Sequence, residues 1–155
     1  MRKLSVLLLF PLFIFSQDHD NHDVNHGHDN EFSIAFGFIP NENFSLGFHA
    51  HYIRGLAFEN KLGLGVSLET ILDEHAHHSI SLITIYRFSH SLTIAYAPGI
   101  LRVSEESKVS YEFTQHFEFA YEIPFGEFHI GPQLDLGIEE EGVHYMVGVH
   151  FGIDF

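Results

Sequence analysis

The sequence predicts an all-β fold, namely an eight-stranded antiparallel up-and-down transmembrane β-barrel, and three observations support this prediction. From residue 32 to residue 155, apolar and polar side chains alternate with a period of two, which places them on opposite faces of strands. Short polar connections separate these segments, so successive strands should form hairpins. The polar face is rich in glycine and histidine and poor in lysine and arginine, which suits a barrel interior.

The first 17 residues have the order of a secretory signal peptide. Arg2 and Lys3 give a basic start, an apolar run follows as far as Phe15, and the small residue Ser16 precedes a polar stretch. The run is short for a membrane-spanning helix, which needs roughly 20 apolar residues, and Pro11 interrupts it. We therefore expect residues 1–17 to be a cleaved signal peptide.

Residues 18–31 are expected to be a disordered tail rich in histidine and aspartate. Val24 is the only aliphatic side chain of this segment, so it cannot bury enough surface to offset the entropy of ordering. Neutral imidazole is a common ligand of zinc, nickel and copper ions, and nearby carboxylates attract cations. The tail therefore contributes four candidate metal ligands, which are His19, His22, His26 and His28. The alternative is a solubilising linker that binds metal only incidentally.

The eight expected strands follow in order along the chain. They are residues 32–38, 44–52, 62–68, 80–88, 92–101, 109–122, 127–138 and 143–155. The last is the most regular, because every second residue from Val143 to Phe155 is apolar. Two residues interrupt the pattern: Gln115 breaks an apolar face, and Pro132 cannot donate to a ladder, so it should mark an edge or a bulge.

The expected connections between these strands are short. They lie near residues 41–43, 54–60, 73–79, 89–91, 102–108, 123–126 and 139–142. An even number of strands joined by hairpins can close without a free edge and brings both chain termini to the same end of the barrel.

Alternation alone fits two kinds of barrel, one with its apolar face inward and one with that face toward lipid. The glycines and histidines of the polar face favour the second kind, because glycine is a poor residue for an exposed strand face. Strands of about 10 residues with aromatic apolar faces also suit a tilted crossing of a bilayer. A soluble lipocalin-like barrel is the alternative.

The closing segment YMVGVHFGIDF, with apolar residues at alternate positions and a terminal Phe155, is similar to the C-terminal recognition signal of bacterial outer-membrane barrels. The pattern of residues 32–155 resembles the small eight-stranded outer-membrane proteins such as OmpA and OmpX. This resemblance implies a Gram-negative outer-membrane location, contact with outer-membrane lipid and insertion by the barrel-assembly machinery, with the tail in the periplasm. It implies no activity, because that architecture hosts many functions.

The amino-acid composition indicates which kinds of partner and ligand to expect. The formal net charge is −14, so nucleic acid is excluded as an expected partner, whereas metal cations and basic partners are attracted. The absence of cysteine excludes disulfides and thiolate metal sites. We expect a monomer without an organic cofactor, and any metal to be zinc, nickel or copper.

Two further groups of histidines lie within the barrel sequence. The connection 73–79 carries His75, His77 and His78 beside two acidic residues, and a polar loop tip is the alternative interpretation. Inward positions carry His116 and His150, which together with Gln133 could form a layer of ligands at one depth. Other inward histidines are His49, His51, His129 and His144. The alternative is a network of polar groups that satisfy one another inside a narrow barrel.

The leading functional hypothesis is an outer-membrane barrel that captures or buffers divalent transition metal ions. The alternative is a structural or partner-binding barrel without a role for metal. An enzyme is not expected, because the sequence contains no nucleophile motif such as G-x-S-x-G. A passive metal pore is not implied, since eight-stranded barrels are normally packed.

Overall fold

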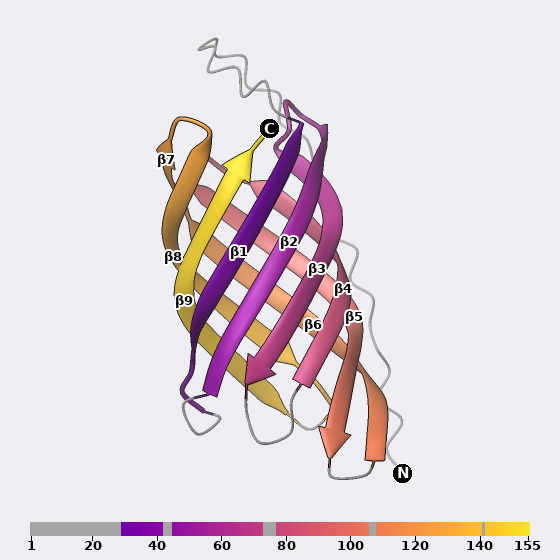
Figure 1. The fold of residues 1–155 in the computed structure, drawn as a ribbon. Coiled ribbons are helices and arrows are strands. Elements are labelled where there is room, and N and C mark those ends of the chain that lie inside the picture. The colour runs from indigo at the N-terminus through magenta and orange to yellow at the C-terminus, as the bar shows by residue number, and fades with distance from the viewer. Residues whose placement is uncertain (1–28, 42–44, 73–76, 106–107, 141) are drawn as a thin grey trace.

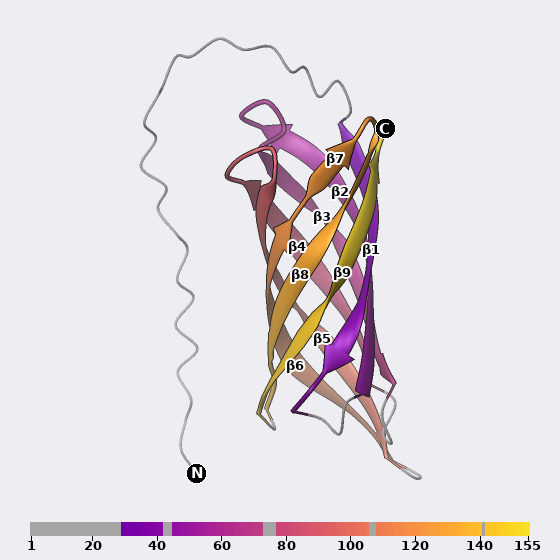
Figure 2. The ribbon, with the colours of Figure 1, turned by 90° about the vertical axis from the view of Figure 1, so that its left-hand side faces the viewer.

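The computed structural model describes residues 29–41, 45–72, 77–105, 108–140 and 142–155. These residues form one antiparallel sheet that closes into a barrel of tilted strands (Figures 1 and 2). The strands are β1 (Asn30–Ile39), β2 (Ser45–Ala57), β3 (Leu62–Leu72), β4 (His77–Arg87), β5 (Leu92–Glu105), β6 (Lys108–Tyr121), β7 (Ile123–Phe125), β8 (Phe128–Ile138) and β9 (Val143–Asp154).

Consecutive strands pair with each other except β6 and β7, and two further pairings close the ring. These are β1 with β9 and β6 with β8. The short strand β7 follows β6 along the same edge of β8, so β6 and β7 together occupy one strand position. The barrel therefore has the eight strand positions that the sequence predicts. The predicted fold class is confirmed.

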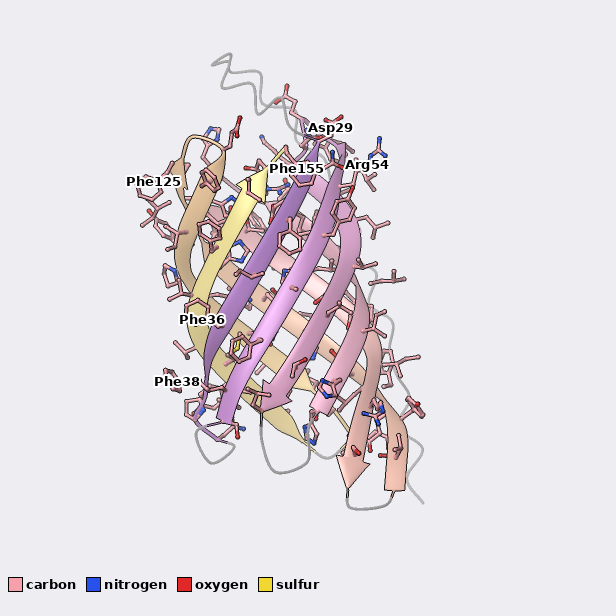
Figure 3. All side chains as sticks on the ribbon, viewed as in Figure 1. Asp29, Phe36, Phe38, Arg54, Phe125 and Phe155 are labelled. Atoms are coloured by element: carbon pink, nitrogen blue, oxygen red, sulfur yellow. The ribbon has the colours of Figure 1, made fainter. Side chains whose placement is uncertain are left out.

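The two chain ends of the barrel meet at what we call the terminal end. Asn30 and Phe155 exchange backbone hydrogen bonds of 3.1 and 2.8 Å there. Figure 3 labels Phe155 close to Asp29 and Arg54 at this end. The opposite end, which carries residues 39–41 and 139–140, is called the far end.

Several strands are longer than the alternation predicts. β1 begins at Asn30, so Glu31 belongs to the sheet and faces Ile53 and Asp154. β2 continues to Ala57, and the turn that follows has positive φ angles of 55–64° at residues 58–60. The alternation of apolar residues assigns the first residues of β1 to the tail and the last residues of β2 to a connection. The reason is that a strand can continue through polar or small residues after its regular apolar face has ended.

The connection predicted at residues 123–126 is also shorter in the structure. β7 occupies most of it and turns back at Gly126, whose φ is +68°. Pro132, expected at an irregularity, lies in β8 where its partner strand changes from β6 to β7, since the ladder passes from Gln133 to Ile130. Its missing N–H therefore falls at an interruption of the hydrogen bonding.

The apolar face of the sheet points outward. Phe38, Leu82 and Tyr111 are 58%, 63% and 70% exposed, and Figure 3 shows Phe36, Phe38 and Phe125 directed away from the barrel. The soluble lipocalin-like alternative requires the opposite arrangement and is therefore wrong. An apolar surface that surrounds a polar interior is the arrangement of a barrel in lipid. Among the described residues, no helix is long and apolar enough to cross a membrane.

Gln115 is a polar residue of the outward face, as the sequence indicates. Gln115 accepts a hydrogen bond of 2.8 Å from the hydroxyl of Tyr96 on the adjacent strand. This bond pairs the Tyr96 hydroxyl with the amide oxygen of Gln115 on a face that is mostly apolar.

The interior is divided into an apolar wall and a polar part. The apolar wall lies on β2, β4 and β5 and consists of Ile53, Ile83, Ile85, Ala95 and Ala97. A second apolar cluster, which includes Ile39 and Ile71, lies toward the far end. Histidines and carboxylates, together with serines, threonines and Gln133, make up the buried polar residues.

Candidate metal-binding interior

In the described part of the chain, six histidines and five carboxylates are buried inside the barrel. They are His49, His51, His116, His129, His144, His150, Glu31, Glu69, Glu118, Glu122 and Asp135. No lysine or arginine is buried among the described residues, and the guanidinium of Arg87, which pairs with Glu31, is 23% exposed. Buried carboxylates are costly unless positive charge is near. Protonated histidines or bound cations must therefore balance this interior.

The first group, which we call the tetrad, consists of Glu69, His116, Asp135 and His144. Each residue offers one ligand atom, and these atoms lie within 4.8 Å of one another. Nε2 of His116 lies 2.9 Å from Glu69, and its Nδ1 lies 3.0 Å from Asp135. Nε2 of His144 lies 3.8 Å from Glu69. The His116 contacts have hydrogen-bond lengths, so much of the tetrad already holds itself together.

The second group, the trio, consists of His49, His51 and Glu118. β2 places both histidines on its inward face because they are two residues apart, and β6 supplies Glu118. Oε1 of Glu118 lies 3.4 Å from Nε2 of His51 and 3.7 Å from Nδ1 of His49. The other nitrogen of His49 lies 3.1 Å from Glu69, so this ring connects the trio to the tetrad.

The third group lies toward the terminal end and consists of Glu31, His129 and His150. The two imidazoles are stacked, with 3.0 Å between their Nε2 atoms, and Glu31 lies 3.8 Å from His129. Gln133 links this group to the trio, since it donates to Glu118 at 2.9 Å and its oxygen lies 3.1 Å from Nδ1 of His150. The three groups therefore form one polar column along the barrel.

Two glycines make space for the histidines of this column. A Cβ at Gly137 would overlap the ring of His144, and a Cβ at Gly152 would overlap the ring of His129. In both cases the glycine is the cross-strand partner of the histidine, in the pairings Gly137↔His144 and Gly152↔His129. A glycine paired across the ladder with an inward histidine thus indicates that the histidine ring fills the space at the glycine. This signal can be recognised once the strand register is known.

Glu139 continues the column at the far end, just beyond β8. Its carboxylate lies 3.6 Å from Nδ1 of His144. Burial raises the pKa of Glu139 above the ordinary value of a glutamate, and His144 opposes part of this shift.

The structure separates several residues that the sequence pattern groups together. It brings Gln133 to His150, but it places His116 in the tetrad, because the register pairs His116 with Gly137 and Gln133 with Gly148. A common layer of His116, Gln133 and His150 is therefore not formed.

The histidines predicted in the connection 73–79 are also divided. His77 and His78 lie in β4 rather than in a loop, and His78 is exposed, with 3.1 Å between its Nδ1 and the hydroxyl of Thr70. Adjacent residues of a strand point to opposite faces, so these two rings do not converge. His19, His22, His26, His28 and His75 lie outside the described residues.

Sequence reasoning identifies His49, His51 and His144 as inward histidines without choosing them as ligands, and it chooses neither Glu69 nor Glu118. Each stands at an inward position of the alternation, which is a signal for burial but not for contact. Glu69 of β3 and His116 of β6 meet across the interior, with two strands between them in the sheet. Only the closure of the barrel brings them together.

Comparison with known proteins finds no matching family profile and no matching curated protein. Two solved structures are similar. The outer membrane protein Ail of Yersinia pestis, in a phospholipid bilayer nanodisc, is 14% identical with a TM-score of 0.53, and the match covers 81% of this chain and 99% of that chain. The N-terminal β-barrel domain of Pseudomonas aeruginosa OprF is 18% identical with a TM-score of 0.58, and the match covers 83% and 98%. At these identities the likeness concerns the fold alone: this chain has the architecture of small bacterial outer-membrane β-barrels.

Proposed function

We propose that this protein is an outer-membrane β-barrel protein that binds divalent transition metal ions, such as zinc, nickel or copper, inside the barrel. The observation that carries the proposal is the set of buried histidines and carboxylates without a buried lysine or arginine among the described residues. A divalent cation would neutralise two carboxylates at once, and neutral imidazoles would complete its coordination. The tetrad is one such site, with His116 as its central ligand.

The apolar outer surface and the likeness to Ail and OprF support the outer membrane as the location. In our proposal the terminal end faces the periplasm, so the histidine-rich residues 18–31 collect metal on that side. The connection that carries His75 then faces the medium. We also propose that the barrel-assembly machinery inserts the protein and that the protein is a monomer.

We propose capture or buffering of metal rather than conduction. The cavity between the polar column and the apolar wall has a volume of about 20 Å³ and is lined by Glu118, His51 and Ile83, among others. This volume has room for about one water molecule, whereas a channel for hydrated ions needs a much wider barrel.

The test is a calorimetric titration of the refolded mature protein with zinc, nickel and copper. We expect the double variant Glu69→Gln, Asp135→Asn to weaken interior binding at least about 10-fold, because it removes both carboxylates of the tetrad. The control is Glu140→Gln, which changes an exposed acidic residue of the far end. Deleting residues 18–28 should remove additional equivalents of metal. Interior binding that is the same in the double variant and the control would refute the tetrad site.

A structural barrel is the second candidate, favoured by the hydrogen-bond lengths around His116. These contacts satisfy the tetrad without an ion if the histidine is protonated. In this case a deletion strain should have altered envelope permeability and unchanged metal tolerance.

A further inference from the structure

The trio and the tetrad differ in the spacing of their ligand atoms. Two ligands of one tetrahedral zinc ion, each bound at about 2.0–2.1 Å, lie roughly 3.3–3.5 Å apart. In the trio, Oε1 of Glu118 lies 3.4 Å from the nitrogen of one histidine and 3.7 Å from that of the other, and the group as a whole offers ligand atoms within 4.8 Å of one another. The contacts of His116 in the tetrad, at 2.9 and 3.0 Å, are too short for this spacing and suit hydrogen bonds. The trio therefore has nearly the geometry of a cation site, whereas the tetrad would have to expand.

The facing atoms of the trio also lack hydrogen bonds. Nδ1 of His49, Nε2 of His51 and Oε1 of Glu118 are buried side-chain atoms without a hydrogen-bond partner in the described part of the chain. The three residues are only 3%, 2% and 5% exposed. A buried polar atom that makes no hydrogen bond destabilises the folded state. Two such nitrogens within 3.7 Å of one such carboxylate oxygen indicate a missing common partner.

The surroundings of the trio offer space and support for that partner. The cavity of about 20 Å³ is lined by His51 and Glu118, which leaves room for a small ligand such as water beside them. Glu69 lies 3.1 Å from Nε2 of His49, on the side of the ring away from Glu118. Gln133 donates to the second oxygen of Glu118. Such outer contacts hold metal-ligating histidines and carboxylates in place.

We infer that the trio is a separate site for a divalent transition metal ion, and that it fills before the tetrad. The ligands are Nδ1 of His49, Nε2 of His51 and Oε1 of Glu118, and a water molecule occupies the fourth position on the cavity side. An ion enters the trio without breaking a hydrogen bond, whereas the tetrad must first give up those of His116. This inference rests on the proposed function and names the site at which it begins.

The test compares two histidine variants, His51→Ala in the trio and His144→Ala in the tetrad. The background is the full mature chain with His19→Asn, His22→Asn, His26→Asn and His28→Asn, so that the tail contributes no imidazole. We expect zinc titration of this background to give a tight class of one equivalent. That class should weaken at least about 100-fold in His51→Ala, which loses one of three ligands, and less than about 3-fold in His144→Ala. His78→Ala, which removes an exposed histidine of β4, is the matched control and should change nothing.

Folding of each variant is checked by its heat-dependent shift on a gel. If His51→Ala does not fold, anomalous scattering from crystals of the background protein grown with zinc replaces it. The expected peak lies between His49, His51 and Glu118. A tight class or a peak at the tetrad alone would overturn this inference and leave the proposed function standing. No zinc bound inside the barrel in any form would overturn both.

Discussion

The two sides of the barrel interior use the same alternation to different effect. On β4 and β5 the inward positions carry Ile83, Ile85, Ala95 and Ala97, which form an ordinary apolar core. On β6, β8 and β9 they carry His116, Asp135 and His144 together with the other polar groups of the column. The apolar side is stabilised by packing alone, whereas each group on the polar side needs a particular partner. The two regions share β2, which carries Ile53 in the apolar wall and His49 and His51 in the polar column.

The largest expected effect of a single substitution is on the apolar wall. Ile83 is fully buried, so Ile83→Ala should leave a cavity and lower the free energy of unfolding by about 2–5 kcal/mol. Urea unfolding of protein folded in lipid vesicles measures this change. Leu82→Ala on the adjacent lipid-facing position, which is 63% exposed, is the control. Leu82→Ala should lower the free energy of unfolding by less, because lipid acyl chains can fill the space that the side chain leaves. Equal losses at the two positions would contradict a packed apolar interior.

A smaller effect is expected from Gln133→Leu on the polar side. The change keeps the volume but removes the hydrogen bonds to Glu118 and His150. Leaving such buried groups without partners should cost about 1–3 kcal/mol. The matched control is Gln115→Leu on the outward face, which removes the hydrogen bond that Tyr96 donates. Vesicle unfolding should show a clear decrease in stability for residue 133 and little change for residue 115, and the opposite order would mean that inside and outside are exchanged.

The smallest expected effect is the dependence on pH at Glu139. Because burial raises the pKa of Glu139 in the folded protein, its ionisation opposes folding, and stability is lost as the pH rises through that pKa. Glu139→Gln should therefore stabilise the barrel slightly near pH 7, by less than about 1 kcal/mol, and the gain should vanish below about pH 4, where glutamate is protonated in both states. Unfolding of both proteins across this range measures the difference. Glu140→Gln, at the exposed neighbouring position, should give no such trend.

The sequence was most informative about faces and least informative about strand ends. Phe36 and Phe38 point outward and His116 points inward as predicted, because the direction of a side chain follows from the local geometry of a strand. Asn30, Glu31 and His77 were placed outside the strands that contain them. Polar inward residues look the same at the end of a strand and in a connection, so alternation of apolar residues cannot locate these boundaries.

The sequence predicted which kinds of residue would be candidate ligands in the interior, but it did not predict which of them would lie together. The alternation identifies His49, His51 and His144 as inward histidines, yet it does not join them to Glu118 or Glu69. Glu69 is the cross-strand partner of His49, so the hairpin register alone brings these two together. Glu118 of β6, by contrast, faces His51 of β2 across the interior, from a strand that is distant both in the sequence and in the sheet. Such contacts depend on the stagger of the strands, which local patterns do not contain.

The amino-acid sequence alone thus determined the number of strand positions in the barrel and their order. It also determined which side chains face lipid and which face the interior. A period of two and short hairpin connections leave few other arrangements for these residues. The tertiary structure decided which interior groups meet, for example that His49 lies between Glu69 and Glu118. This outcome depends on the register at which β6 closes against β8, because a closed barrel fixes the relative height of residues on opposite walls.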